Sequence, residues 1–167
     1  MIRSILYATD LGLYAPYVLQ HALALAQAFR APLNVVHAVE PISLLAESVL
    51  KSYLDHDTLE EIRSKGLSTV MSSIERRVLE TFREELDETG EDVTLIRAVR
   101  VLQGDPPQVI LAEAKRLAVD LLVIGSHSQT LRMEVPMGRT AQRLLQLAEI
   151  PVYLVPILQP HEQGAAE

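Results

Sequence analysis

Glycines, hydroxyl side chains and one arginine are concentrated in two short segments of the chain. Gly125-Ser126-His127-Ser128 follows a strongly apolar run, and Gly138-Arg139-Thr140 precedes a helical stretch. A glycine lets the backbone approach a ligand closely, and a glycine just before a helix leaves amide groups open to a phosphate. Serine hydroxyls and an arginine guanidinium donate hydrogen bonds to phosphate oxygens. The two segments therefore favour a site for a phosphate-bearing ligand.

Few other kinds of chemistry are available to this chain. It has no cysteine, which excludes disulfides, thiolate metal sites and a cysteine nucleophile. The five histidines are scattered without the spacing of metal ligands. Apart from Asp10, no carboxylate pair, no nucleophile with a base and no magnesium-ligand cluster stands out. The residues favour binding over catalysis.

Composition and charge narrow the class of protein. With 167 residues, 49% of them hydrophobic, the chain can bury one sizeable core. The net charge of -7 disfavours a nucleic-acid partner, which requires a cationic surface, although one small phosphate can still be bound locally. No apolar run approaches the roughly 18 residues of a membrane span, and the first residues show no basic flank with a cleavage site. We expect a cytoplasmic protein with neither a membrane nor a nucleic-acid partner.

The candidate residues must be held by a framework of alternating strands and helices. Short β-compatible runs predict five strands, at 2–9, 33–39, 93–102, 119–124 and 151–155. Amphipathic stretches predict four helices, at 15–29, 58–89, 106–117 and 141–147. Strand, helix, strand units of this length imply parallel pairing. The predicted fold is α/β, a doubly wound, Rossmann-like five-stranded parallel sheet with helices on both faces.

The domain organisation follows from the same pattern. Residues 1–157 are expected to form one domain, and the polar residues 158–167 a disordered tail. The stretch 42–57 is an ambiguous insertion of unknown role. Ligands of doubly wound sheets bind at the carboxyl ends of the strands, where the strand order reverses. The loops after the first and fourth predicted strands, which begin at Asp10 and Gly125, are the two best placed to line such a crevice.

The same landmarks resemble a known family. Gly125, two residues, Ser128, nine residues and Gly138 is similar to the signature of nucleotide-binding universal stress proteins, which is glycine, two residues, glycine, nine residues, glycine and then serine or threonine. Ser128 stands at the second glycine, and Arg139 at the serine or threonine. The resemblance extends from residue 1 to about 156, and it is carried further by Tyr7-Ala8-Thr9-Asp10, Val35-Val36-His37-Ala38-Val39, Gly104-Asp105-Pro106 and Ile150-Pro151-Val152-Tyr153-Leu154-Val155.

The resemblance implies a stress-response regulator that binds ATP or AMP, with magnesium as a companion of ATP. In ATP-binding members, the aspartate after the first strand and the backbone of the second hold the base, and the glycine loop holds ribose and phosphates. Arg139 is added because its guanidinium suits phosphate. The candidate binding residues are Thr9, Asp10, Ala38, Gly104, Gly125, Ser126, Ser128, Gly138, Arg139 and Thr140. The family also implies a homodimer, and the apolar last strand could pair edge to edge with its twofold mate.

Each candidate residue also has an ordinary structural interpretation. Asp10 could cap the following helix, His37 could be a hydrogen-bonded core histidine, and His127 could be an exposed loop residue. Gly104 could serve only the turn before a helix that starts at Pro106, with Asp105 as its N-cap. Arg139 could pair with Glu134 on the surface, and the Ser126, Ser128 and Thr130 cluster is also common loop composition.

Three functions remain open on the sequence. The first is a dimeric regulator that senses an adenine nucleotide. The second is an interaction protein of the same fold that binds no nucleotide and acts through its dimer surface, which Ser128 and Arg139 support. The third is a slow nucleotide hydrolase or transferase, for which the residues offer only Asp10.

Overall fold

The chain forms one five-stranded parallel sheet with the strand order β3-β2-β1-β4-β5. The computed structural model describes residues 1–40, 72, 75–84, 93–127 and 137–157. The strands are β1 (Ile5–Ala8), β2 (Leu33–Val39), β3 (Ile96–Gln103), β4 (Leu121–Gly125) and β5 (Val152–Val155). The predicted α/β class is confirmed. The first and third strands each begin three residues later than predicted, the third because Val93–Leu95 forms a 3₁₀ turn, η2.

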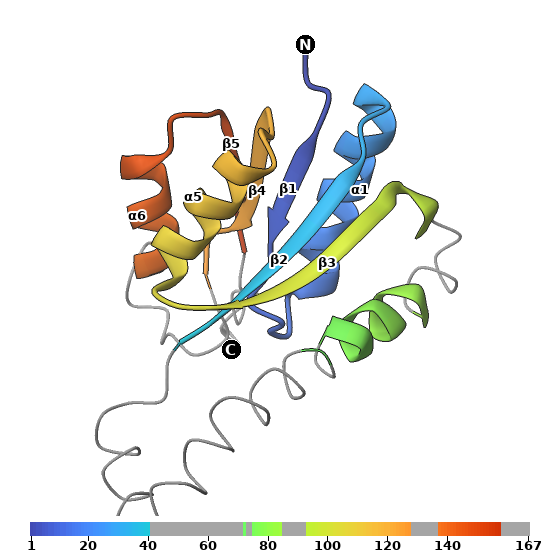
Figure 1. Cartoon of the computed structure of the whole chain (residues 1–167), viewed down its shortest axis with the longest axis horizontal. Coiled ribbons are helices and arrows are strands. Elements are labelled where there is room, and N and C mark those ends of the chain that lie inside the picture. The colour runs from blue at the N-terminus through green and yellow to red at the C-terminus, as the bar shows by residue number, and fades with distance from the viewer. Residues whose placement is uncertain (41–71, 73–74, 85–92, 128–136, 158–167) are drawn as a thin grey trace, which may run out of the picture.

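Helices cover both faces of the sheet (Figure 1). Helix α1 (Ala15–Phe29) lies on one face, and α5 (Pro106–Arg116) and α6 (Arg139–Leu147) lie on the other. Residues 75–84 are helical and pack on the same side as α1, which agrees with part of the helix predicted at 58–89. The remainder of that helix, the 42–57 stretch and the predicted tail lie outside the described residues.

The alternation of side chains along β1 divides the core in two. Ile5 and Tyr7 pack with α1, whereas Leu6 packs with α5 and α6. The strand is paired on both edges, Ile5 facing Leu33 in β2 and Leu121 in β4. A parallel strand covered on both faces must be apolar throughout, which the sequence Ile-Leu-Tyr-Ala satisfies.

Helix α1 is placed by a buried tyrosine. Its N-cap residue, Tyr14, makes no side-chain capping hydrogen bond, and a proline occupies the first turn. The Tyr7 hydroxyl instead donates to the Ala15 carbonyl at 3.0 Å, which ties the first turn of the helix to β1. The helix ends at Arg30, whose φ of 51° and amide bonds to Ala26 and Gln27 form a left-handed cap.

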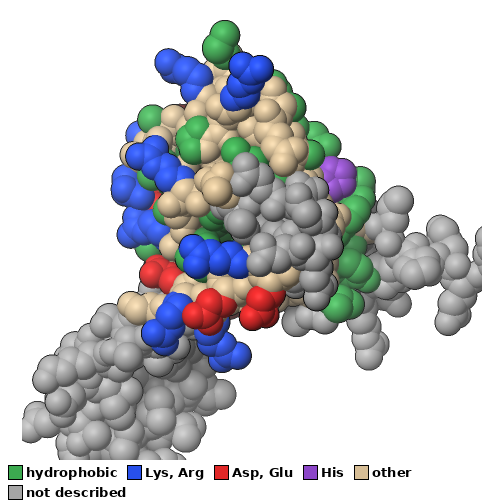
Figure 2. Space-filling view, turned by 90° about the vertical axis from the view of Figure 1, so that its right-hand side faces the viewer, with side chains coloured by type: hydrophobic (Ala, Val, Ile, Leu, Met, Phe, Trp, Pro, Cys, Tyr) green, Lys and Arg blue, Asp and Glu red, His purple; other side chains and the backbone are tan. Residues whose placement is uncertain are grey.

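None of the helices in the described part of the chain is long and apolar enough to cross a membrane. On the face shown in Figure 2, Lys and Arg side chains lie at the top, along one border and near the centre, and a small group of Asp and Glu side chains has Lys or Arg side chains both above and below it. Charges of both signs therefore lie close together on this face. Local charge, rather than the total, decides what each region can bind.

One buried carboxylate joins α5 to β3. Glu113 is only 4% exposed, and its oxygens accept hydrogen bonds from the Arg116 side chain at 2.7 and 2.8 Å. Arg100 of β3 adds a bond of 3.2 Å. The Arg116 hydrogen bonds and the charge of Arg100 hold the pKa of Glu113 below its ordinary value of 4.5, although burial acts in the opposite direction.

Replacing Glu113 by glutamine should lower the free energy of unfolding at pH 7 by about 1–3 kcal/mol, because two guanidinium groups lose their charged acceptor. A carboxylate with a lowered pKa stabilises the fold above its ordinary value of 4.5 and loses that contribution as the pH falls through the folded-state pKa. The difference between wild type and Glu113→Gln should therefore shrink from pH 7 to pH 3 in urea unfolding. The exposed Glu149→Gln serves as control, and an equal difference at both pH values would contradict the assignment.

Candidate functional site

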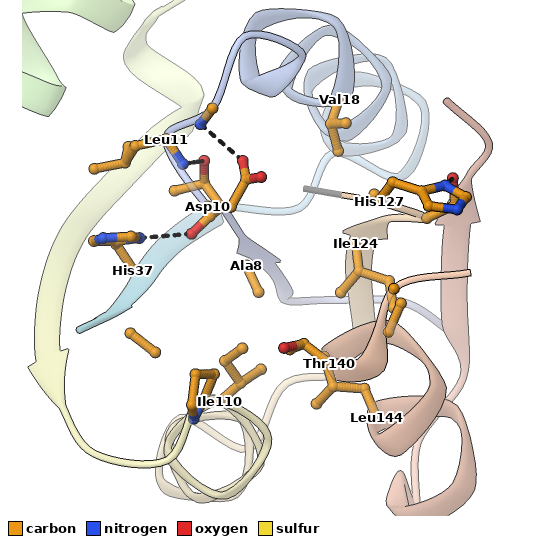
Figure 3. Close-up of a pocket in the computed structure, with 18 of the residues that line it drawn as sticks. Ala8, Asp10, Leu11, Val18, His37, Ile110, Ile124, His127, Thr140 and Leu144 are labelled. Carbon is orange, nitrogen blue, oxygen red and sulfur yellow. Dashed lines mark hydrogen bonds between the residues drawn. The ribbon is translucent and has the colours of Figure 1, made fainter. Parts of the chain in front are cut away.

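A cavity of about 680 Å³ lies at the carboxyl ends of β1, β2 and β4 and is closed on one side by the first turn of α6 (Figure 3). This is where the strand order reverses, since the chain leaves β1 toward β2 and later returns to β4. Its size lies within the range of small-molecule sites. The candidate residues that line it are Thr9, Asp10, Ala38, Gly125, Ser126, Gly138, Arg139 and Thr140.

The loop after β1 is folded around two side-chain oxygens. The Asp10 carboxylate accepts the Gly12 amide at 2.9 Å, and the Thr9 hydroxyl accepts the Leu11 amide at 3.1 Å. Both are bonds to the residue two positions ahead, the local pattern that Asp and Thr favour in turns. Asp10 therefore does not cap α1, and its exposed carboxylate lies at the cavity wall.

His37 supports this loop from the neighbouring strand. Its Nδ1 lies 2.8 Å from the Thr9 carbonyl oxygen. A carbonyl can only accept, so Nδ1 must carry the hydrogen. His37 is hydrogen-bonded, as one interpretation of the sequence expected, but it is half-buried at the cavity wall rather than within the core.

The segment after β4 is bound tightly into the fold. Ser126 is buried, its amide donates to Val155, and its hydroxyl accepts the Ile157 amide at 2.9 Å. The same hydroxyl lies 2.9 Å from His127 Nδ1. His127 is half-buried and hydrogen-bonded, so the expectation of an exposed loop residue is wrong. Gly125 fits here because an added Cβ would lie 3.2 Å from a methyl carbon of Val18.

The first turn of α6 provides the amide groups best placed for an anion. The Gly138 amide donates to the Ser126 carbonyl at 2.9 Å, so it is not free to bind a phosphate as the sequence suggested. The first intrahelical bond runs from Gln142 to Gly138, which leaves the Arg139, Thr140 and Ala141 amides without an acceptor inside the helix. Figure 3 shows the Thr140 side chain directed toward the cavity.

Opposite charges lie at different walls of the cavity. Asp10 and Glu40 contribute carboxylates from the ends of β1 and β2, and Arg139 contributes a guanidinium at α6. In Figure 3, Asp10 and Thr140 lie on opposite sides of the cavity. A ligand with hydrogen-bond donors at one end and a negative charge at the other would match this arrangement.

No group of three or more histidine, aspartate or glutamate side chains that could hold a metal ion occurs within residues that the structure describes. These residues supply no dedicated cation site. A magnesium ion that accompanied a triphosphate would take most of its ligands from phosphate oxygens and water, as this ion commonly does.

One candidate residue, Gly104, does not line the cavity. It has a φ of 150°, and its amide donates to Val39 at 2.9 Å, so it shapes the turn between β3 and α5. Asp105 holds the N-cap position of α5 but makes no side-chain capping bond. Ser128, like Thr130 and the predicted pair of Arg139 with Glu134, lies outside the described residues.

Sequence reasoning overlooked Leu11, Gly12 and Glu40, which also line the cavity. Leu11 and Gly12 directly follow Asp10, and Glu40 directly follows β2, so adjacency to the predicted residues was the available signal. Pattern analysis favoured small and hydroxyl residues in glycine-rich segments. It gave no weight to a leucine or to a glutamate at a strand end.

The sequence matches a known family over nearly its whole length. The model described as the universal stress protein family matches residues 1–156. A universal stress protein of Thermus aquaticus is 31% identical over 158 residues, which are 93% of this chain and 99% of that protein. Universal stress protein MJ0577 of Methanocaldococcus jannaschii is 23% identical over 159 residues, which are 93% of this chain and 95% of that protein.

Solved structures show the same fold. The structure of MJ0577 has a TM-score of 0.70 with 22% identity and covers 96% of this chain and 99% of its own. A universal stress protein in complex with cAMP has a TM-score of 0.58 with 15% identity and covers 93% of this chain and 97% of its own.

Replacing Gly104 by alanine should lower the free energy of unfolding by about 1–3 kcal/mol. The added Cβ would lie 2.5 Å from Val109 Cγ2, at a φ that side-chain-bearing residues rarely adopt. Urea unfolding of Gly104→Ala, Val109→Ala and the double variant separates the steric contact from the backbone strain. Replacing Val109 by alanine relieves the contact but leaves the strained φ at residue 104. Wild-type stability in Gly104→Ala would contradict this structural role.

Proposed function

The chain belongs to the universal stress protein family, and on that premise we propose that it is a cytoplasmic stress-response regulator that binds an adenine nucleotide, ATP or AMP, in the cavity at the carboxyl edge of the sheet. The observation that supports this most directly is the cavity itself. It brings together residues from the ends of β1, β2 and β4 and from the first turn of α6, segments that are far apart in the sequence.

The two ends of the cavity match the two ends of a nucleotide. The amino group of adenine and the hydroxyls of ribose are donors, and the carboxylates of Asp10 and Glu40 are acceptors on the strand side. The phosphate is an anion, and the α6 amide groups and the Arg139 guanidinium suit it on the opposite side. The similar protein in complex with cAMP supports an adenine nucleotide as the ligand class.

Binding is proposed rather than turnover. Within the described part of the chain, the Ser126 hydroxyl is buried and engaged with Ile157 and His127, so it is not presented as a nucleophile. No group of three or more histidine or carboxylate side chains there could hold a metal ion beside Asp10. Regulation then requires that the ligand favour one conformation or partner over another.

A second proposed property, homodimerisation through β5, has its own support. β5 is an edge strand. The carbonyl groups of Pro151 and Val155 accept bonds from β4, so alternation along the strand directs the backbone groups of Val152 and Leu154 away from the sheet. An unpaired edge of this kind is complementary to the same strand of a second copy. Such an interface would also serve an interaction protein that binds no nucleotide.

Native mass spectrometry of freshly purified protein should show a mass excess equal to AMP or ATP, and titration calorimetry should then give affinities for AMP, ATP and adenosine. Arg139→Ala should weaken AMP binding roughly tenfold, because one charge-assisted hydrogen bond to phosphate is lost. Adenosine, which has no phosphate, should bind wild type and variant alike. The proposal fails if wild type binds no adenine nucleotide with or without magnesium.

Sedimentation velocity at micromolar concentration should show a dimer for the wild type and a monomer for Val152→Pro. Proline removes an amide that points away from β4, so the sheet is kept while the outer edge loses a donor. Val152→Thr retains the amide and the branched shape and should remain dimeric. A wild-type monomer would exclude this interface.

A further inference from the structure

The loop from Thr9 to Gly12 contains a strained residue at the cavity wall. Leu11 has a φ of 57°, a left-handed conformation that costs a leucine roughly 1–2 kcal/mol. Strain of this kind persists only where the surrounding contacts determine it, and it concentrates at functional sites. Leu11 lines the proposed nucleotide cavity, so the strain occurs where a fixed backbone would be useful.

Contacts on both sides hold this conformation. The Leu11 amide donates to the Thr9 hydroxyl, and the Thr9 carbonyl accepts from His37. On the other side, the Ala15 amide donates to the Gly12 carbonyl at 3.0 Å and continues the chain into α1. The turn is therefore anchored to β2 at one end and to a helix at the other, with Asp10 between them.

The missing side chain of Gly12 determines where the Asp10 carboxylate can lie. A Cβ on Gly12 would be 2.9 Å from Oδ2, 3.1 Å from Oδ1 and 3.2 Å from Cγ of Asp10, so the whole carboxylate occupies the space that a side chain would take. The Gly12 amide donates to Oδ1 at 2.9 Å. Figure 3 shows this bond beside that between Leu11 and Thr9.

We propose that Gly12 is a positioning residue, which fixes the Asp10 carboxylate against the backbone so that its remaining acceptor capacity is directed to the ligand. This inference rests on the proposed nucleotide binding. An unrestrained aspartate would lose rotamer freedom on binding, whereas one already held by the Gly12 amide loses less. The strained Leu11 backbone is the structural condition that brings the Gly12 amide to the carboxylate.

Gly12→Ala should weaken AMP binding roughly tenfold, the loss expected for one misplaced hydrogen bond to a charged group. Its melting temperature should stay close to wild type, because the atoms that must move belong to the end of an exposed side chain. Leu13→Ala, next in sequence, 67% exposed and outside this cavity, is the control and should bind AMP as wild type does.

A double-mutant cycle with Asp10→Ala tests whether Gly12 acts through the carboxylate. In the Asp10→Ala background, Gly12→Ala should produce no further loss of AMP affinity, and a full tenfold loss there would overturn the proposal. A crystal structure of Gly12→Ala gives a readout that needs no nucleotide, since the carboxylate should be turned away from residue 12. Wild type that binds no AMP would refute the proposed function, whereas an unmoved carboxylate would refute only the role of Gly12.

Discussion

The structure depends on the pairing of β1 with both β2 and β4. A parallel pair requires a crossover, so the chain that leaves β1 must cross one face of the sheet to reach β2 and the other face later to reach β4 and β5. α1 therefore covers one side, and α5 and α6 cover the other. The loops at the carboxyl end of β1 and β4 diverge to opposite faces, which leaves the cavity between them. The strand order therefore sets the position of the cavity, and no single side chain does.

Buried hydrogen bonds then determine which groups remain available inside this cavity. Ser126 joins three segments, because its amide donates to Val155, its carbonyl accepts from Gly138 and its hydroxyl accepts from Ile157. These bonds satisfy polar groups that would be costly to leave unpaired in a buried position. They also consume the donors that a glycine-rich segment is expected to offer a phosphate. In the proposed site, the groups left to bind an anion are therefore the amides of the next residues of α6 and the Arg139 guanidinium.

The loop after β1 combines local turn chemistry with strain. Thr9 and Asp10 each bond the amide two residues ahead, which is common for these residue types. The leucine between them adopts a left-handed backbone that its own preferences oppose. Hydrogen bonds to β2 and α1 hold the turn in place despite the free-energy cost of this backbone conformation. The result is a carboxylate held by the Gly12 amide at the side of the cavity opposite the α6 helix terminus.

The sequence alone predicted the fold class, three of the five strands closely, α1 and α5, and the family, because apolar periodicity and turn residues are local properties that the chain carries in order; β1 and β3 begin three residues later than predicted. It also named eight of the residues that line the cavity, since parallel strands end at one edge. It misjudged His127, the Gly138 amide and the place of Gly104, and it overlooked Leu11, Gly12 and Glu40. These features could be read only from the folded chain, because the partner of a hydrogen-bonding group and the space around a glycine depend on segments that are distant in the sequence.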